Sequence, residues 1–174
     1  ADPLPVRRGN ETILIVEDSP DNMKLFRTLL TLHGPDVMGL GGGEGLIRHI
    51  LDSRPHPEAL LALLAGSAEN PEADVLGPML REWPSLRAVL ELGVTVSGTG
   101  RRETGLERGE YDQGQYTAVR PVLAVNTAGM LVRRSVLEEL GGFDRDLPIF
   151  GNDLDFGWRA ALAGRSTLVV PSAV

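Results

Sequence analysis

An unbroken apolar run at residues 12–16 constrains the fold of this chain most strongly. The run is rich in β-branched residues and does not alternate polar with apolar positions, which is typical of a strand covered on both faces in a parallel sheet. The next four residues, Glu17 to Pro20, predict a turn into a helix, because serine favours the N-cap and proline the first helical position. We therefore expect the chain to begin as an α/β protein.

Strands and helices are expected to alternate through the first third of the chain. Helices over residues 20–33 and 44–53 on either side of a strand at 36–40 give a β-α-β-α opening. A leucine- and alanine-rich helix over 57–69 follows with no strand before it. The remainder predicts strands at 73–77, 86–96 and 166–170, a strand or pair of strands at 122–132, helices at 133–140 and 153–163, and a glycine-rich loop at 98–115. The predicted fold class is α/β, a three-layer sandwich with a mostly parallel sheet, in which the β-α-β-α opening is followed by a mixed second half.

Composition excludes several classes of protein. A length of 174 residues is about one domain or a tight pair, and the absence of cysteine excludes disulfides, zinc-thiolate sites and thiol catalysis. A formal charge of -7 argues against a nucleic-acid partner, and no apolar run approaches the roughly 20 residues of a membrane span. Residues 1–10 lack the apolar stretch of a signal peptide, so we expect a flexible leader and a cytoplasmic protein.

Glu17 and Asp18 are the first candidate site. They follow the first predicted strand at its carboxyl end, where open α/β sheets bind their ligands. Two adjacent carboxylates could hold Mg²⁺, which prefers a few carboxylates together with water and phosphate oxygens. A solvated pair that complements the dipole of the following helix is the more common explanation of such a sequence, and metal binding stays open beside it.

Residues 13–34 resemble the opening of a bacterial response-regulator receiver domain. The resemblance covers about residues 11–54 and implies that Glu17 and Asp18 correspond to the acidic metal-binding pair of a receiver. Where the phosphoacceptor aspartate should stand, the chain has an apolar helix instead, and Lys24 is its only lysine. Phosphoryl transfer to an aspartate is therefore not expected.

Residues 151–159 contain the second candidate site, at a predicted boundary between loop and helix. Asp153 and Asp155 lie two residues apart, and Trp158 and Arg159 follow them, so the segment offers a general base with a cationic partner nearby. In the alternative interpretation Asp153 caps the helix, Asp155 complements the helix dipole and Trp158 is a core residue.

Four segments in this order resemble the carboxyl half of a family-2, GT-A type glycosyltransferase: residues 125–134, 137–144, 152–159 and 169–171. The resemblance covers about residues 52–174. It implies that Asp153, with Asp155 beside it, supplies the base that deprotonates an acceptor hydroxyl, although Asn152 stands in place of the usual glutamate. It also implies an acceptor side formed by Gly141, Gly142, Phe143, Asp144, Trp158 and Arg159.

The donor side of such an enzyme is incomplete. Family members carry an Asp-x-Asp metal motif just before the helix that corresponds to residues 57–69, and here only Asp52 is placed to be a remnant of it. Mg²⁺ or Mn²⁺ and a nucleotide sugar are possible ligands, with Asp52, Glu17 and Asp18 as candidate metal ligands. Three arginines of the glycine-rich loop could contact phosphates, but solvated charges or pairs with the nearby glutamates are the favoured interpretation: Arg101, Arg102 and Arg108, with Glu103, Glu107 and Glu110.

Our leading hypothesis is therefore a recombined or engineered chimera, with residues 11–56 from a receiver and 57–174 from a glycosyltransferase, merged into one domain. Neither active site is complete, so we expect the protein to be catalytically inactive. Incomplete sets of strands expose a sheet edge, which predicts self-association as a dimer. The alternatives are a working glycosyltransferase with Asp153 as base, and a receiver-like module that binds phosphate or Mg²⁺.

Overall fold

The computed structural model describes residues 12–15, 36–39, 58–144, 146–147 and 151–174. The chain divides into two compact units, Ala1–Ser53 and Arg54–Val174. In the first unit β1 (Thr12–Ile15) and β2 (Asp36–Gly39) pair in parallel. Both strands were predicted, whereas the two helices predicted beside them lie outside the described residues. The prediction that the units merge into one domain stays a prediction.

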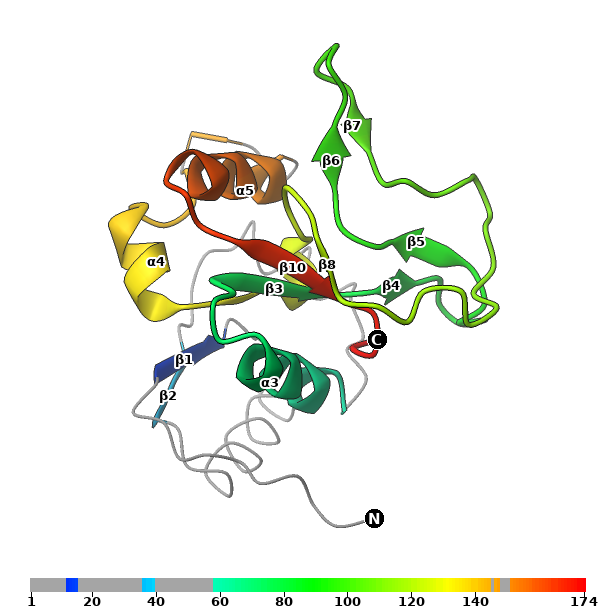
Figure 1. The fold of residues 1–174 in the computed structure, drawn as a ribbon, viewed down its shortest axis with the longest axis horizontal. Helices are drawn as coiled ribbons and strands as arrows, with labels where there is room; N and C mark the ends of the chain where they lie inside the picture. Colours follow the sequence, from blue (N-terminus) through cyan, green and yellow to red (C-terminus); the bar gives the residue numbers. More distant parts are fainter. Residues whose placement is uncertain (1–11, 16–35, 40–57, 145, 148–150) are drawn as a thin grey trace. The chain divides into compact units, whose positions relative to one another are not determined.

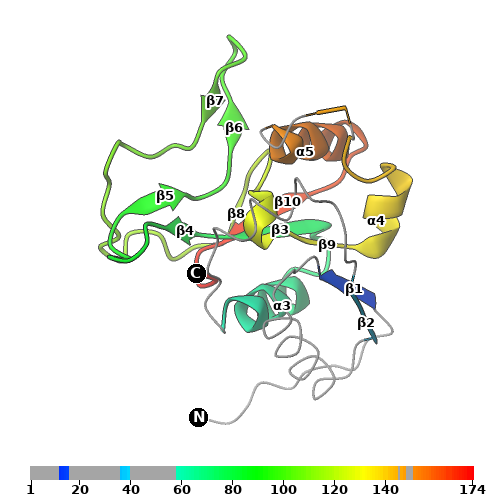
Figure 2. The ribbon, with the colours of Figure 1, turned by 180° about the vertical axis from the view of Figure 1, so that it is seen from behind.

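A four-stranded sheet in the order β8-β10-β3-β9 forms the centre of the second unit (Figure 1). β3 (Val75–Pro78) and β10 (Thr167–Val170) are the parallel central pair. β8 (Arg120–Pro121) and β9 (Leu131–Val132) pair antiparallel at the two edges (Figure 2). The sheet is therefore mixed, as expected for the second half of the chain, and only its central pair is parallel.

Two antiparallel ribbons follow β3. β4 (Leu80–Arg81) pairs with β5 (Val89–Glu91), and β6 (Thr95–Val96) pairs with β7 (Arg102–Glu103). The strand predicted at the position of β5 and β6 is thus two short strands. The glycine-rich segment begins as one arm of a hairpin, so the prediction of a loop without structure of its own is wrong there.

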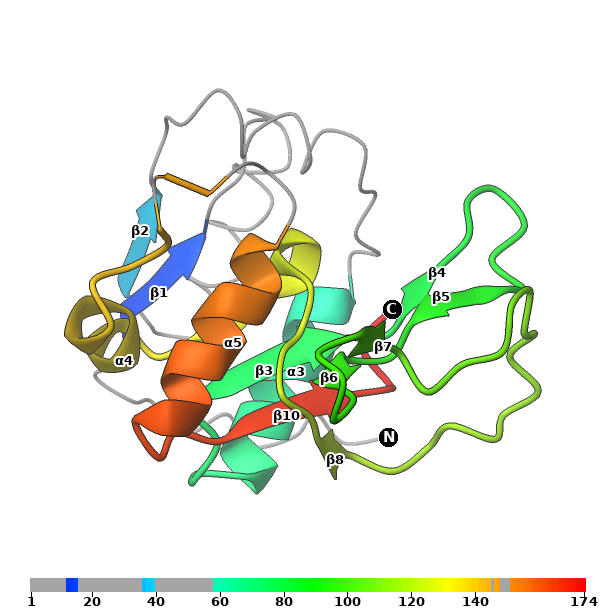
Figure 3. The same cartoon turned by 90° about the horizontal axis from the view of Figure 1, so that it is seen from above.

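Helices α3 (Ala59–Glu69) and α5 (Asn152–Leu162) cover opposite faces of the sheet (Figures 1 and 3). Successive residues of a strand point to opposite faces, so the central strands contribute to two separate buried clusters. The cluster on the α5 face contains Val75, Met79, Val89, Leu92, Val125, Phe156 and Val169. The cluster on the α3 face contains Leu63, Ala73, Leu76, Val170 and Ala173. α3, α5 and β10 were all predicted from the sequence.

The predicted strand at 122–132 is wrong over most of its length. Only β9 at its end pairs in the sheet, and the 3-10 helix η1 (Thr127–Gly129) precedes β9. The side chain of Asn126 accepts a hydrogen bond from the backbone N–H of Ala128 at 3.0 Å and so caps this helix. The next predicted helix is present as α4 (Arg134–Glu139), which ends at two glycines with positive φ.

The edges of the four-stranded sheet are short, because β8 and β9 have two residues each. A short edge strand offers few unpaired backbone groups to a second copy. Dimerisation through a sheet edge stays a prediction, which the mass of the protein in solution would test. Among the described helices, none has the length and hydropathy needed to cross a membrane.

Candidate active site at the start of α5

The first turn of α5 holds two buried polar side chains. Gly151 precedes the helix with a φ of +98°, in the left-handed region, and acts as its N-cap. Asn152 and Asp153 follow with 9% and 6% of their surface exposed. No side chain caps this helix, so the interpretation of Asp153 as an N-cap is wrong. A buried carboxylate instead requires a partner that balances its charge.

Arg102 of β7 is that partner. Its Nη2 atom lies 2.9 Å from Oδ2 of Asp153 and 2.6 Å from Oε2 of Glu91, the last residue of β5. The two carboxylates are more than 90% buried, whereas 40% of the arginine side chain is exposed. The expectation that Arg102 contacts phosphates or pairs with a glutamate of its own loop is therefore corrected. One partly solvated guanidinium balances two buried carboxylates.

The protonation of Glu91 is shifted by this environment. Burial raises the pKa of Glu91 above its ordinary value, and the charge of Asp153 raises it further. The guanidinium of Arg102 and a hydrogen bond with Asn126 act in the opposite direction and lower the pKa. Glu91 therefore keeps a proton to higher pH than an ordinary glutamate, which leaves the positive charge of Arg102 available to Asp153.

Asp153 has the placement of a general base. The amino-terminal end of a helix favours a negative charge, and the ion pair with Arg102 stabilises the Asp153 carboxylate. A carboxylate held in this way can accept a proton from a hydroxyl group within hydrogen-bond distance. The neighbouring Oδ1 of Asn152 is buried and has no hydrogen-bond partner among the described residues, so a second acceptor atom lies beside the base in the chain.

Asp155 takes part in a different set of contacts. Its Oδ2 accepts hydrogen bonds from Nε and Nη2 of Arg159, at 2.9 and 2.7 Å. Arg159 also donates from Nη1 to the carbonyl oxygen of Leu140 at 2.7 Å and from Nη2 to that of Gly142 at 2.9 Å. These bonds tie α5 to the turn that ends α4. The two aspartates therefore have different partners. Asp153 forms an ion pair with Arg102, whereas Asp155 takes part in the contacts between α5 and the turn that ends α4.

The remaining residues expected on an acceptor side lie around that connection. Phe143 packs against Phe156, with ring centroids 5.0 Å apart, and Oδ1 of Asp144 accepts a hydrogen bond from the N–H of Asp146. Trp158 is 47% exposed, so its interpretation as a core residue is wrong. Their part in binding an acceptor, with that of Gly141, stays a prediction.

The described residues do not supply a metal site. The candidate ligands Glu17, Asp18 and Asp52 lie outside the described part of the chain. Within that part no three side chains of histidine, aspartate or glutamate gather as metal ligands. Glu91 and Asp153 are both engaged by Arg102, so this pair does not fit a divalent cation.

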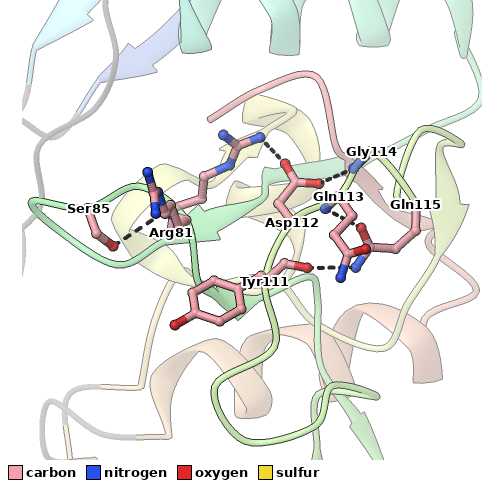
Figure 4. Close-up of polar contacts among 8 residues, drawn as sticks. Arg81, Ser85, Tyr111, Asp112, Gln113, Gly114 and Gln115 are labelled. Atoms are coloured by element: carbon pink, nitrogen blue, oxygen red, sulfur yellow. Dashed lines mark hydrogen bonds and ion pairs between the residues drawn. The ribbon is translucent and has the colours of Figure 1, made fainter.

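A second polar cluster holds the far end of the glycine-rich segment (Figure 4). Arg81 of β4 forms an ion pair with Asp112, whose other oxygen accepts the N–H of Gly114 at 2.9 Å. Gln115 accepts the N–H of Gln113 through its side chain and donates to the carbonyl oxygen of Tyr111 at 2.9 Å. These contacts close the turn after Tyr111 and fasten it to β4, so the cluster has a structural role.

Comparison with known proteins places the site in a family. The model of "Glycosyltransferase like family 2" matches residues 51–174. Two curated relatives from Mycobacterium tuberculosis, strains CDC 1551 / Oshkosh and ATCC 25618 / H37Rv, are each named "N-acetylglucosaminyl-diphospho-decaprenol L-rhamnosyltransferase". Both are 33% identical over 135 residues, which cover 67% of this chain and 41% of theirs. A crystal structure of GalNAc-T7 with UDP, GalNAc and Mn2+ aligns with a TM-score of 0.47 and 14% identity, over 91% of this chain and 36% of that one.

The chain spans less than half the length of these proteins. The matched residues agree with the resemblance predicted for 52–174, while none of the comparisons supports a receiver domain at 11–54 or a chimera. Glu91, Arg102 and Asp153 all lie inside the matched region. The chain therefore belongs to the glycosyltransferase-like family 2.

Proposed function

We propose that this protein transfers a sugar from a nucleotide-sugar donor to an acceptor hydroxyl, with Asp153 as the general base. The observation that carries the proposal is the buried Asp153 carboxylate at the start of α5, paired with Arg102 inside the region that matches the family. The name of the mycobacterial relatives, a rhamnosyltransferase, supports the same class of reaction.

The reaction needs one proton acceptor and one leaving group. The acceptor hydroxyl gives its proton to the Asp153 carboxylate while its oxygen forms a bond to the anomeric carbon of the donor sugar. The bond from that carbon to the nucleoside diphosphate breaks, and its electron pair goes to the phosphate oxygen. Arg102 forms an ion pair with the Asp153 carboxylate that accepts the proton. The candidate ligands on the donor side, Glu17, Asp18 and Asp52, lie outside the described part of the chain.

A binding and turnover experiment tests this function. Calorimetry with a panel of nucleotide sugars, with and without Mg²⁺ or Mn²⁺, is combined with a turnover assay on the same panel. The Asp153→Asn variant keeps the shape of the side chain but cannot accept the proton. We expect it to bind the donor like the unmodified protein and to lose at least about 100-fold in kcat.

The matched control is Asp146→Asn, which changes an exposed aspartate whose backbone N–H, rather than its side chain, contacts Asp144. We expect this variant to turn over donor at the unmodified rate. Failure of the protein to bind or turn over any nucleotide sugar would refute the proposal and leave the inactive fold as the explanation. Full activity of Asp153→Asn would refute the assignment of the base.

A further inference from the structure

We propose that Arg102 is a positioning residue for the transfer reaction: its guanidinium holds the Asp153 carboxylate in place, and Glu91 anchors the guanidinium from β5. This inference rests on the function proposed above and extends it to two residues outside α5. It assigns the hairpin of β6 and β7 to the active site through Arg102, which acts through Asp153 rather than on the substrate itself.

The geometry of the three charged groups supports a positioning role for Arg102. A single nitrogen of Arg102, Nη2, lies within 3 Å of one oxygen from each carboxylate. The carboxylates are buried, so water does not solvate them well. The partly solvated guanidinium of Arg102 supplies the positive charge that stabilises them. Displacing Arg102 would leave two buried carboxyl groups without their cationic partner.

The three residues come from three different elements of the fold. Glu91 ends β5, Arg102 begins β7 and Asp153 lies in the first turn of α5, beside which the β6–β7 hairpin lies (Figures 1 and 3). Arg102 lies on a strand of only two residues. Pairing between two strands of this length contributes little stability on its own. The ion pairs therefore fix the hairpin and the base relative to each other.

The requirements of a general base also favour a positioning role for Arg102. Asp153 must be ionised and must present one oxygen to the incoming hydroxyl. Arg102 engages Oδ2, so we assign Oδ1 as the atom that takes the proton. A guanidinium fixes the orientation of a carboxylate better than an ammonium group, because its donors have a fixed planar geometry. Loss of Arg102 should therefore affect the chemical step more than the binding of the donor.

Three variants test the inference: Arg102→Gln, Arg102→Lys and, as the matched control, Arg87→Gln at an exposed arginine between β4 and β5. Turnover of a nucleotide sugar is measured over a range of donor concentrations. For Arg102→Gln we expect kcat to fall about 10- to 100-fold, with KM for the donor nearly unchanged. Arg102→Lys should recover part of the rate, and Arg87→Gln should match the unmodified protein.

A second measurement does not depend on activity. Carboxyl ¹³C NMR follows the titration of Glu91 in each variant, and thermal melting verifies that each variant is folded. Because Arg102 lowers the pKa of Glu91, Arg102→Gln should raise that pKa, whereas Arg87→Gln should not. Should Arg102→Gln not fold, the kcat and KM of Arg102→Lys carry the test, because lysine keeps the charge of arginine but not its planar donors.

The outcomes separate this inference from the proposed function. An unmoved Glu91 titration overturns the inference, as does a normal kcat in Arg102→Gln, and in the latter case the transferase function stands. A shifted titration in a protein that turns over no nucleotide sugar refutes the proposed function itself, and with it any positioning role for Arg102.

Discussion

Nη2 of Arg159 donates a hydrogen bond to the carbonyl oxygen of Gly142 at 2.9 Å. Through this bond, and a second one to the carbonyl oxygen of Leu140, helix α5 holds the turn that follows α4. The family resemblance placed Arg159 on the acceptor side, and the structure shows that its guanidinium is occupied by backbone carbonyls and Asp155. We therefore expect replacement of Arg159 to change the stability of the fold.

Arg159→Lys should destabilise the fold. A lysine ammonium carries its three donors on one nitrogen and cannot reach Asp155 and both carbonyls together, so partly buried acceptors lose their partners. We expect the free energy of unfolding to fall by about 1–3 kcal/mol in urea denaturation. The control is Arg165→Lys, which changes a surface pair with Glu139 and should cost less than about 1 kcal/mol. Equal losses in both variants would contradict the prediction.

Gly157→Ala should also destabilise the second unit. A Cβ at Gly157 would lie 2.4 Å from the carbonyl oxygen of Leu123 and 2.5 Å from Cβ of Ala124, so α5 would have to move away from that segment. Overpacking of this kind costs about 1–3 kcal/mol, measured as a lower midpoint of denaturation. Gly98→Ala is the control, because a Cβ there meets no atom within 4 Å. A midpoint for Gly157→Ala that matches the control would refute the close approach.

Asp153 is a candidate from the sequence because local pattern and family motif coincide at the start of α5, and its role as the base stays a proposal. Glu91 was missed, although its position carried a clue. In β5 the residues are buried, exposed and buried in turn, so Glu91 shares the inward face with Val89. A charged residue at an inward position of a strand indicates a buried partner. The identity of that partner, Arg102, depends on how two ribbons pack, which local sequence does not encode.

The errors in the fold have a related cause. An apolar run such as 122–132 has the composition that is typical of a strand. Whether it pairs in a sheet depends on neighbours that are distant in the sequence. Here Ala124 forms an isolated bridge with Val94, and Asn126 turns the chain into η1. Helices with glycine after their last residue, α4 and α5, were predicted well, since their ends are set by local backbone conformation.

Glu91→Gln should change how stability depends on pH. The pKa of Glu91 is raised in the folded protein, so the folded state binds this proton more readily than the unfolded chain does. Its contribution to stability is complete below the ordinary glutamate pKa and is lost as pH rises through the raised value. Glutamine does not titrate, so the variant should gain stability over the unmodified protein between mildly acidic and neutral pH.

Urea denaturation at several pH values measures this gain. Glu138→Gln is the control, because Glu138 forms an exposed pair with Arg134 within α4. The difference between this control and the unmodified protein should not change across the same pH range. A constant difference for Glu91→Gln as well would show that Glu91 titrates alike in the folded and unfolded chains.

Tyr116 should titrate at lower pH when Glu110 loses its charge. The hydroxyl of Tyr116 donates to Oε1 of Glu110, and this bond is the main cause that raises the pKa of the phenol and lowers that of the carboxyl. Absorbance of the phenolate in a Tyr111→Phe background isolates Tyr116, because the chain has 2 tyrosines. In that background Glu110→Gln should move the titration midpoint down toward that of free tyrosine. Glu107→Gln, which removes a nearby exposed charge, should leave the midpoint almost unchanged, and an equal shift in both variants would show that general charge rather than the hydrogen bond raises the pKa of Tyr116.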